Sequence, residues 1–312
     1  MAKQIINTVL MVRPAAFRMN EETAVNNFFQ EDLQIKNEDI NKKAQEEFDA
    51  FVKKLNDIGV QTVVVEDKKE FDTPDSIFPN NWVSFHENGT AVVYPMFAEN
   101  RRRERRMEIF ELLENKGFKI NEVLDYTNAE EEGVFLEGTG SIILDRVNQK
   151  AYCSLSPRAD EELFIEFCED MEYTPVIFIA YQDVDGKRKP IYHTNVMMCI
   201  AEEFAVICLD TIDDPKEKKN VVSHLKEDGK EIITITQAQV HNFAGNMLQV
   251  RGGNNKKYLV MSTAAFQSLT KGQINSIEKH CEILSTDIRT IETCGGGSTR
   301  CMLAEVFLPS GD

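Results

Sequence analysis

The sequence has little of what several protein classes require. It has no excess of basic residues, because 35 Lys and Arg stand against 52 Asp and Glu and the net charge is −17. Such an acidic chain repels phosphate backbones and anionic headgroups, so we expect no nucleic-acid partner and no membrane partner. No apolar run approaches the roughly 20 residues of a transmembrane helix. The best apolar stretch, Val176 to Tyr181, predicts a buried strand instead.

Paired cysteines are absent as well. The chain has seven cysteines, an odd number, with no CxxC spacing. This argues against a disulfide framework and against a zinc ribbon. The first residues lack the apolar core and the cleavage site of a signal peptide. We therefore expect a cytoplasmic protein with reduced thiols, no metal and no organic cofactor.

Linkers rich in Pro, Gly or Ser are also missing, so we expect residues 1–312 to form a single domain. Helical patterns alternate with short apolar runs, which is typical of an α/β fold. We predict helices at residues 48–58, 102–116, 158–171 and 213–226, two short helices within 262–280, and strands at 61–66, 175–180, 231–235 and 286–291.

Hairpins fill the gaps between these elements. The Asn-Gly turn at 88–89 predicts one of them, between NNWVSF and TAVVYP. Three more are predicted in GSIILDRVNQKAYCSL, HTNVMMCIAEEFAVICLD and NMLQVRGGNNKKYLVMS. The last strand, CMLAEVFL, has no partner after it. We expect it to pair with NTVLMVRP near the N-terminus and so close a ring.

The hairpins recur at a nearly constant period. The residues that open them are Asn81, Glu137 and His193, which are 56 residues apart in both steps. Another 108 residues lead to Cys301, with Asn246 near the midpoint. This is an internal repeat of hairpin, helix and strand. If five units surround an axis, these residues converge at one end, where a thiol, an imidazole and a carboxylate would share a pocket.

Cys301 is the candidate nucleophile. It lies in CGGGSTRCMLAE, where three glycines allow the backbone to approach a ligand closely. The adjacent Arg300 is a cation that can favour a thiolate. The alternatives are that Cys301 is an ordinary buried strand thiol, or that Cys294 is the reactive one.

His193 and Glu137 are the candidate partners of this thiol. A histidine suits the base or proton shuttle that a cysteine nucleophile needs. Glu137, in FLEGTGSIIL, is a carboxylate in an apolar segment and needs a partner if it is buried. The alternatives are a structural histidine at a strand start, with His241 as the rival base, and a solvated carboxylate in a turn.

These segments resemble the guanidino-group-modifying hydrolase superfamily, which includes arginine deiminases, dimethylarginine dimethylaminohydrolases, agmatine deiminases and amidinotransferases. The resemblance covers Asn7 to Pro309, and its most specific parts are GGGSTRCM, the His193 strand and FLEGTG. The branch that it resembles most is typified by citrulline ureidase, through MVRPAAFRMNEETAVNNFFQ, DSIFPNNWVSF, NRRRERR and CGGGSTRCMLAE. The resemblance implies a single-domain, five-fold pseudosymmetric α/β propeller of ββαβ repeats, in agreement with the period.

The resemblance carries the catalytic cysteine, histidine and glutamate of the superfamily to Cys301, His193 and Glu137. At two positions where guanidine-processing members have acidic residues, this sequence has Asn81 and Asn195. A buried guanidinium would lose its compensating charge there, whereas an asparagine amide offers a donor and an acceptor to a neutral ureido group. The sequence therefore favours citrulline over arginine. The alternative is that both asparagines are structural.

The resemblance also implies arginines for the amino-acid end of the substrate. Arg158, in SLSPRADE, would hold the α-carboxylate. A second arginine would come from NRRRERR, with Arg101 and Arg103 as candidates. The alternative is a solvated helix terminus, although an arginine at the positive end of a helix is locally unfavourable.

Together these residues predict the hydrolysis of L-citrulline to L-ornithine, ammonia and CO2 through an S-carbamoyl-cysteine intermediate. One alternative is an arginine or agmatine deiminase-type guanidino hydrolase. Another, from a different class, is a non-catalytic amino-acid-binding propeller. The expected partner is the small-molecule substrate. The sequence leaves open whether the chain forms a homo-oligomer.

Overall fold

The computed structural model describes residues 2–311, which contain five three-stranded sheets of one topology. In each sheet the first strand is antiparallel to the second, and the second is parallel to the third. In that order the sheets are β17 (Ala304–Glu305), β1 (Thr8–Arg13) and β2 (Gln61–Glu66); β3 (Val83–Phe85), β4 (Thr90–Val93) and β5 (Glu122–Asp125); β6 (Ile142–Asp145), β7 (Lys150–Ser154) and β8 (Thr174–Phe178); β11 (Met198–Ile200), β12 (Phe204–Ile207) and β13 (Glu231–Thr234); β14 (Leu248–Arg251), β15 (Lys257–Ser262) and β16 (Glu282–Thr286).

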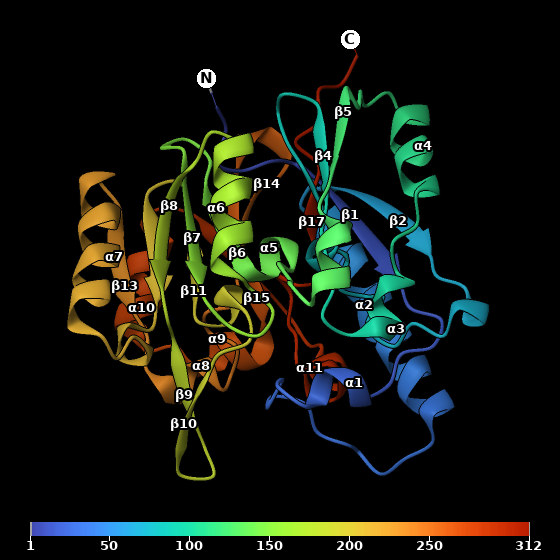
Figure 1. The fold of residues 1–312 in the computed structure, drawn as a ribbon, viewed down its shortest axis with the longest axis horizontal. Coiled ribbons are helices and arrows are strands. Elements are labelled where there is room, and N and C mark those ends of the chain that lie inside the picture. The colour runs from blue at the N-terminus through green and yellow to red at the C-terminus, as the bar shows by residue number, and fades with distance from the viewer. Residues whose placement is uncertain (1, 312) are drawn as a thin grey trace.

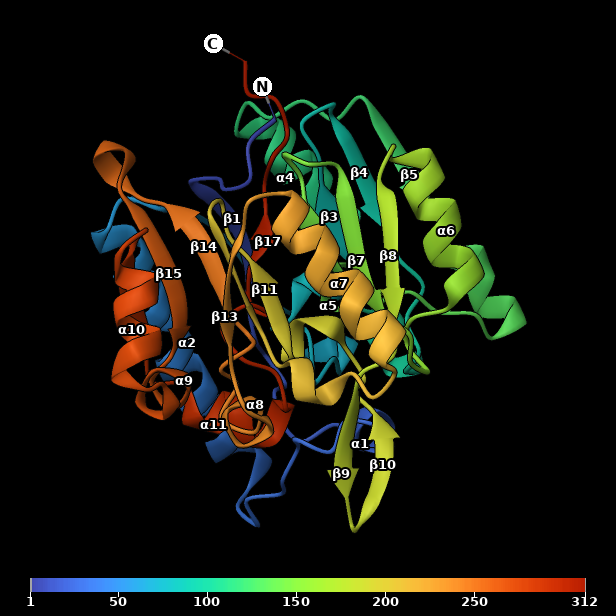
Figure 2. The ribbon, with the colours of Figure 1, turned by 90° about the vertical axis from the view of Figure 1, so that its left-hand side faces the viewer.

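A helical connection joins the second and third strands of every sheet, as a parallel pair requires. These helices are α2 (Asn37–Asp57), α3 (Glu99–Arg102) with α4 (Glu108–Asn115), α6 (Glu161–Asp170), α7 (Pro215–Glu227), and α9 (Thr263–Ser268) with α10 (Lys271–Glu278). In α2 the buried Phe48, Phe51 and Leu55 recur at helical spacing, and Gly59 follows with φ +84°. The helices α4, α6, α7 and α10 lie at the periphery, with the strands inside (Figures 1 and 2).

The two ends of the chain form one sheet. Strand β17 pairs antiparallel with β1, with Glu305 opposite Val9, so the predicted pairing of CMLAEVFL with NTVLMVRP is confirmed. The first strands of neighbouring sheets also pack together, as β6 does with β11 and β17 does with β3. The repeated α/β unit is therefore present in all five sheets, while its closure into a five-fold propeller stays a prediction.

The four internal hairpins are confirmed, but two predicted elements are wrong. The helix predicted at 102–116 is broken between α3 and α4. The break lets Arg101 reach Asn81 while Arg106 donates to the Glu66 carbonyl at 2.9 Å. Arg158 also lies outside its predicted helix, because α6 begins after the capping residue Asp160.

The strand predicted at 286–291 is also wrong. Strand β16 ends at Thr286, and α11 runs over Arg289–Gly295. The buried Ile288, Ile291 and Cys294 recur every three residues, which suits a helix and not a strand. The carboxylate of Glu47 accepts from the backbone N–H groups of Thr290 and Ile291 at 2.9 and 3.0 Å, which satisfies donors that a helix start leaves free.

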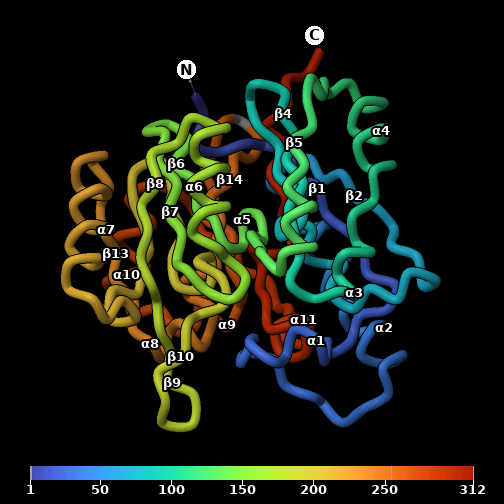
Figure 3. Tube along the Cα trace, viewed as in Figure 1, coloured from blue at the N-terminus to red at the C-terminus, as the bar shows by residue number. Residues whose placement is uncertain are grey.

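Some short elements lie outside the predictions. They are α1 (Glu21–Ala24), α5 (Gly138–Ser141), α8 (Gln237–Val240) and the hairpin β9 (Tyr181–Val184) with β10 (Lys187–Pro190). The segment around α1 runs beside α11 (Figure 3). All seven cysteines are buried and unbridged. Within residues 2–311, no helix is both long and apolar enough to cross a membrane.

Candidate active site

The candidate side chains project from short turns and not from the strands themselves. Asn81 ends a 3-10 turn, Glu137 precedes α5, and His193 precedes a 3-10 turn at Thr194–Val196. The sequence predicted these residues as the first of each inner strand. A strand residue faces one side of its sheet, whereas a residue on the turn before the strand can point past its end into a common space.

Glycines let these turns approach each other. Gly138 has φ +43°, and a Cβ atom there would lie 2.4 Å from the Asn80 carbonyl oxygen. At Gly140 a Cβ atom would lie 2.4 Å from Asn81 Nδ2 and 2.8 Å from His193 Nδ1. The GTG sequence after Glu137 is therefore a packing requirement of the site.

Cys301 lies at the centre of a cluster of amides. Its Sγ atom is 3.4 Å from Asn195 Nδ2 and 3.3 Å from Asn246 Nδ2, and the residue is 3% exposed. Asn246 Oδ1 accepts from the backbone N–H of Arg300 at 3.0 Å, which turns the amide NH2 group toward the sulfur. Two N–H donors stabilise negative charge on a thiolate. Asn195 Oδ1 is buried and has no hydrogen-bond partner within residues 2–311.

Glu137 and His193 form a buried pair. Glu137 Oε2 is 2.7 Å from His193 Nε2 and 3.5 Å from Arg158 Nη1. Burial opposes ionisation of Glu137, but Arg158 and the His193 hydrogen bond hold its pKa well below the usual range. Burial lowers the pKa of His193 to about 4, although Glu137 opposes this shift. A neutral His193 then donates from Nε2 to Glu137, which leaves Nδ1 with its lone pair as a base.

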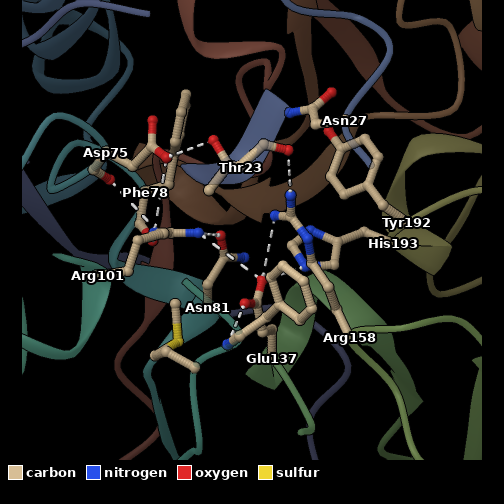
Figure 4. A network of polar contacts seen from close by, with 12 residues as sticks. Thr23, Asn27, Asp75, Phe78, Asn81, Arg101, Glu137, Arg158, Tyr192 and His193 are labelled. Carbon is tan, nitrogen blue, oxygen red and sulfur yellow. Dashed lines mark hydrogen bonds and ion pairs between the residues drawn. The ribbon is translucent and has the colours of Figure 1, made fainter. Parts of the chain in front are cut away.

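Arg101 and Glu104 form a second buried pair next to Asn81. Arg101 donates to Glu104 through Nε at 2.9 Å and through Nη2 at 3.0 Å. Its Nη1 donates to Asn81 Oδ1 at 2.8 Å. Arg101 and Arg158 lie on opposite sides of Asn81 and Glu137 (Figure 4). The pair fixes the oxygen end of the Asn81 amide and leaves its NH2 group beside Gly140.

Asp75 contributes a carboxylate that sequence reasoning missed. It is 2% exposed, and its Oδ2 atom accepts from Asn20 Nδ2 at 2.7 Å and Thr23 Oγ1 at 3.2 Å. Its Oδ1 atom has no hydrogen-bond partner within the described chain. Burial raises the pKa of Asp75, while Arg101 opposes the shift. A buried carboxylate oxygen that accepts no hydrogen bond is suited to bind a cation or an N–H group of a ligand.

These groups surround a narrow cavity with about 240 Å³ of space between atoms, part of which is open to solvent. Its walls are Asn27, Asp75, Phe78, Asn81, Arg101, Arg158, Tyr192, His193, Gly295, Gly297 and Cys301. The segment after α1 covers one side, where Asn27 Nδ2 is 3.3 Å from the Gly295 and Gly296 carbonyl oxygens. On the side that this segment covers, a ligand is shielded from bulk water, which strengthens electrostatic interactions there.

Of the eight site residues predicted from the sequence, seven come together here. Glu137 and Asn195 contact the others, and the remaining five line the cavity: Cys301, His193, Asn81, Arg158 and Arg101. Arg103 does not reach the cavity, because it is exposed and donates to the Asp72 and Asn100 carbonyl oxygens.

Most N–H groups of Arg158 are already bound. Nε donates to Asn26 Oδ1 at 2.8 Å and Nη2 to the Thr23 carbonyl at 2.9 Å. The guanidinium lies 4.9 Å from the Tyr192 ring centroid. A carboxylate that binds Arg158 through two hydrogen bonds must therefore exchange with one of these partners.

Sequence reasoning also missed Glu104 and Tyr192. Glu104 stands three residues after Arg101, a spacing that places two helical side chains together. Asp75 stands six residues before Asn81 within DSIFPNNW, beside the buried Ile77 and Phe78. The carboxylate within this apolar segment was the signal by which the sequence could have identified Asp75 as a site residue.

The arrangement suits nucleophilic chemistry. A thiol held by two amides, a neutral imidazole and an ionised carboxylate in one covered site are the parts of a cysteine-dependent hydrolase. Within residues 2–311, no three His, Cys, Asp or Glu side chains are placed to hold a metal ion.

Comparison with solved structures shows which proteins share this fold. The chain matches ArgZ, an arginine dihydrolase from cyanobacteria, with 15% identity and a TM-score of 0.73 over 97% of this chain and 41% of ArgZ. It matches the N-terminal domain of ArgZ bound to product with 15% identity and a TM-score of 0.69, over 98% of this chain and all of that domain. The chain thus spans about two fifths of full-length ArgZ. A dimethylarginine dimethylaminohydrolase variant, an adduct with S-methyl-L-thiocitrulline, matches with 15% identity and a TM-score of 0.63, over 96% of this chain and 99% of that one.

The fold is therefore the α/β fold of the guanidino-group-modifying superfamily. A family model described as "N,N dimethylarginine dimethylhydrolase, eukaryotic" matches residues 13–308. The chain belongs to this family. A search of curated proteins found no match. The superfamily resemblance is thus confirmed, and its citrulline-specific branch stays a prediction.

Proposed function

We propose that this protein hydrolyses a C–N bond of an arginine-type guanidino group through a covalent adduct of Cys301. The observation that supports this most is the buried Asp75 oxygen without a donor, in the cavity that also holds Cys301 and His193. A guanidinium or ammonium group supplies both the charge and the N–H donors that this oxygen lacks.

The charge balance of the site supports a cationic substrate. Two guanidinium groups, Arg101 and Arg158, face three carboxylates, Asp75, Glu104 and Glu137. Burial raises the pKa of Glu104 to about 8 and also raises that of Asp75, but Arg101 opposes both shifts and donates two hydrogen bonds to Glu104. In the state in which Arg101 keeps both carboxylates ionised, the site has one negative charge in excess. Arginine, with a net charge of plus one, would neutralise it, whereas citrulline would leave it uncompensated. The expectation that Asn81 and Asn195 deprive the site of compensating charge therefore overlooked Asp75.

The residues support a two-stage reaction. The Cys301 thiol passes its proton to His193 Nδ1, and its sulfur bonds to the guanidinium carbon. The C–N bond to the leaving nitrogen breaks, and that nitrogen takes the proton from His193 and departs as ammonia or an amine. Water then adds to the amidino carbon and gives a proton to His193. The C–S bond breaks as the new hydroxyl passes its proton to the sulfur, which returns the thiol and forms the ureido carbonyl, and His193 gives its proton to the released amine. The net reaction converts a guanidinium group and water to a ureido group and an ammonium ion.

The known chemistry of the structural relatives agrees with this proposal. ArgZ is described as an arginine dihydrolase of an ornithine-ammonia cycle, and one variant of its N-terminal domain is covalently bound to a reaction intermediate. A related protein, AgrE, has been solved with L-arginine. We extend the arginine-type substrate, and the covalent intermediate, to this chain as part of the proposal.

Hydrolysis of citrulline to ornithine is the second candidate, and the amides beside Cys301 favour it. Asn195 presents an unpartnered buried Oδ1, which suits an N–H of a ureido group. The same thiol, base and water would form and cleave an S-carbamoyl adduct. An enzyme that acts on both compounds would release two ammonia molecules from each arginine.

The test is turnover of arginine, dimethylarginine, agmatine and citrulline by the purified protein, with Cys301→Ala as the control. We expect ammonia or amine release from a guanidino substrate and none from the variant. Release from citrulline alone would replace the main proposal with the second candidate. Binding without turnover of any substrate would support the amino-acid-binding alternative and contradict both.

A further inference from the structure

The turn before β14 brings a further side chain to the nucleophile. Asn246 lies two residues ahead of β14, as Asn81 lies two residues ahead of β3. It is fully buried, and its Nδ2 atom is 3.3 Å from Cys301 Sγ. Of the described residues, those that line the active-site cavity include Cys301 but not Asn246. Asn246 therefore contacts the sulfur from outside the space that a ligand occupies.

The orientation of the Asn246 amide is fixed at both ends. Besides the sulfur, Nδ2 contacts the Asn195 carbonyl oxygen at 3.1 Å, so both of its N–H groups have acceptors. Oδ1 accepts from the backbone N–H of Arg300 at 3.0 Å. The Asn195 amide, which also approaches the sulfur, is less constrained, because its Oδ1 has no hydrogen-bond partner within the described chain. Asn246 is thus the donor that the fold holds toward Cys301.

The backbone that presents Asn246 is itself strained and tightly packed. Phe243 has φ +59°, in the left-handed region that aromatic residues rarely adopt, and its carbonyl accepts from the Asn246 N–H at 2.9 Å. At Gly245 a Cβ atom would lie 2.4 Å from the Val196 carbonyl oxygen. The Asn246 carbonyl accepts from Thr299 Oγ1 at 3.3 Å, on the loop of the nucleophile. A strained turn persists only where the surrounding structure determines it, and such turns cluster at functional sites.

The attack on a guanidino carbon requires negative charge on the Cys301 sulfur, because the thiolate is the nucleophile and the thiol is not. An N–H donor favours the charged form of its acceptor, since a hydrogen bond to a charged group is stronger than one to a neutral group. The Asn246 N–H therefore stabilises the thiolate more than the thiol. An interaction that strengthens along the reaction raises its rate.

We propose that Asn246 is a catalytic residue, whose amide stabilises the negative charge on the Cys301 sulfur as the thiol gives its proton to His193. This role rests on the proposed function, in which Cys301 forms the covalent adduct. Asn246 forms no bond to the substrate and exchanges no proton. It contributes to the rate of the attack and not to substrate binding, because it lies outside the cavity.

The first test is alkylation by iodoacetamide without substrate, with mass spectrometry of the peptide that contains Cys301. Asn246→Asp keeps an oxygen for the Arg300 N–H but replaces the NH2 group by a second oxygen, which repels a thiolate. We expect the alkylation rate at pH 7 to fall by about 10-fold to 100-fold, in line with a lost hydrogen bond to a charged group. The matched control is Asn242→Asp, which adds the same charge at an exposed residue bound to the Ala238 carbonyl and should keep the wild-type rate.

The pH dependence of alkylation separates stabilisation of the thiolate from a structural role. At about pH 9.5 the thiolate forms more readily without the amide, so the difference between Asn246→Asp and the wild type should shrink. A rate lowered by the same factor at both pH values would indicate a displaced loop and overturn the proposal. Unchanged alkylation at pH 7 would overturn it as well. Asn246→Ala removes the donor without adding charge and gives the same test if Asn246→Asp does not fold.

The second test is steady-state kinetics with arginine. In Asn246→Ala we expect kcat to fall by about 10-fold to 100-fold and KM to stay within about threefold of the wild type, since the lost contact is to the sulfur and not to the substrate. A higher KM with unchanged kcat would contradict this role. If the wild type turns over no substrate, the proposed function fails, whereas alkylation of Cys301 still decides whether Asn246 stabilises the thiolate.

Discussion

Two buried arginines of this protein differ in what balances their charge. Arg158, 1% exposed, lies near Glu137 and donates to Asn26 and to the Thr23 carbonyl. Arg146, 7% exposed, forms no salt bridge within residues 2–311 and borders an open pocket that it shares with Glu87 and Glu172. The first belongs to a closed network that positions reactive groups, and the second has no part in that network. Equal burial therefore says little about function until the partners are known.

The largest expected effect comes from removing the carboxylate that balances the charge of Arg158, so that Arg158, like Arg146, has no salt bridge. Glu137→Gln removes the carboxylate beside Arg158 and His193, so we expect kcat/KM to fall by about 10³-fold and the free energy of unfolding by about 3 kcal/mol. Steady-state kinetics and urea unfolding measure the two. Glu305→Gln, which unpairs Arg300 outside the active site, should lower stability and keep kcat/KM within a few fold. Equal loss of activity in both variants would contradict a catalytic role that is specific to Glu137.

A smaller effect is expected from Gly140→Ala. The new methyl group would lie 2.4 Å from Asn81 Nδ2 and 2.8 Å from His193 Nδ1. We expect kcat to fall by about 10²-fold, because displacement of a catalytic base by a fraction of an ångström disrupts its alignment. Gly117→Ala is the control, since its φ of +90° strains the backbone but nothing lies within 4 Å of the added Cβ. Normal activity of Gly140→Ala would show that the contact between these turns is dispensable.

Glu104→Gln tests the network around Arg101. The substitution weakens two hydrogen bonds to Arg101 and so frees the group that holds Asn81 Oδ1. We expect KM to rise about 10-fold with a smaller change in kcat, in line with a lost charge-assisted bond. Glu108→Gln removes an exposed carboxylate from Arg106 and serves as the control. A variant with unchanged KM and kcat would contradict a positioning role for Glu104.

The pH dependence follows from the pKa of His193, which burial lowers to about 4. The base is then neutral above that value, so kcat/KM of the free enzyme should stay level as pH falls from 7 to 5 and drop near pH 4. The unfolded chain, with a His pKa of about 6.5, binds more protons between these values. Stability should therefore fall as pH decreases from about 6.5 to 4, and less so in His193→Gln. An acidic limb near pH 6.5 would contradict this environment.

The smallest effect is expected from Arg103→Gln. Arg103 is exposed and donates only to the backbone carbonyl oxygens of Asp72 and Asn100. We expect KM and kcat to stay within about twofold of the wild type, as for other exposed polar contacts. A 10-fold rise in KM would restore Arg103 to the substrate site that the sequence suggested.

The sequence predicted the repeat, and it predicted that the first residues of the repeats meet in one site, because both features depend on spacing along the chain. The constant step between Asn81, Glu137 and His193 places them on equivalent turns, and the hairpins follow from alternating apolar residues. The break between α3 and α4 was not predictable in this way. It depends on where Arg101 and Arg106 find partners in three dimensions.

The charge of the site also escaped prediction, for a physical reason. The sequence argument asked only whether acidic residues stand at the positions of Asn81 and Asn195, where they would balance the charge of a substrate guanidinium. The charge that balances a substrate is the sum of all charges in the cavity. Asp75 and Glu104 contribute to this sum because the fold places them next to Arg101, which the sequence alone does not show. Arg146 shows the converse, since its lack of an ion pair is invisible in the sequence.

The central claim is that the excess negative charge around Cys301 selects a cationic guanidino substrate over a neutral ureido one. The most direct measurement is product accounting, with arginine and citrulline supplied separately at equal concentration and ammonia, citrulline and ornithine quantified over time. The account predicts that arginine is consumed with a higher kcat/KM than citrulline, and that Cys301→Ala consumes neither. Turnover of citrulline to ornithine with no turnover of arginine would contradict it.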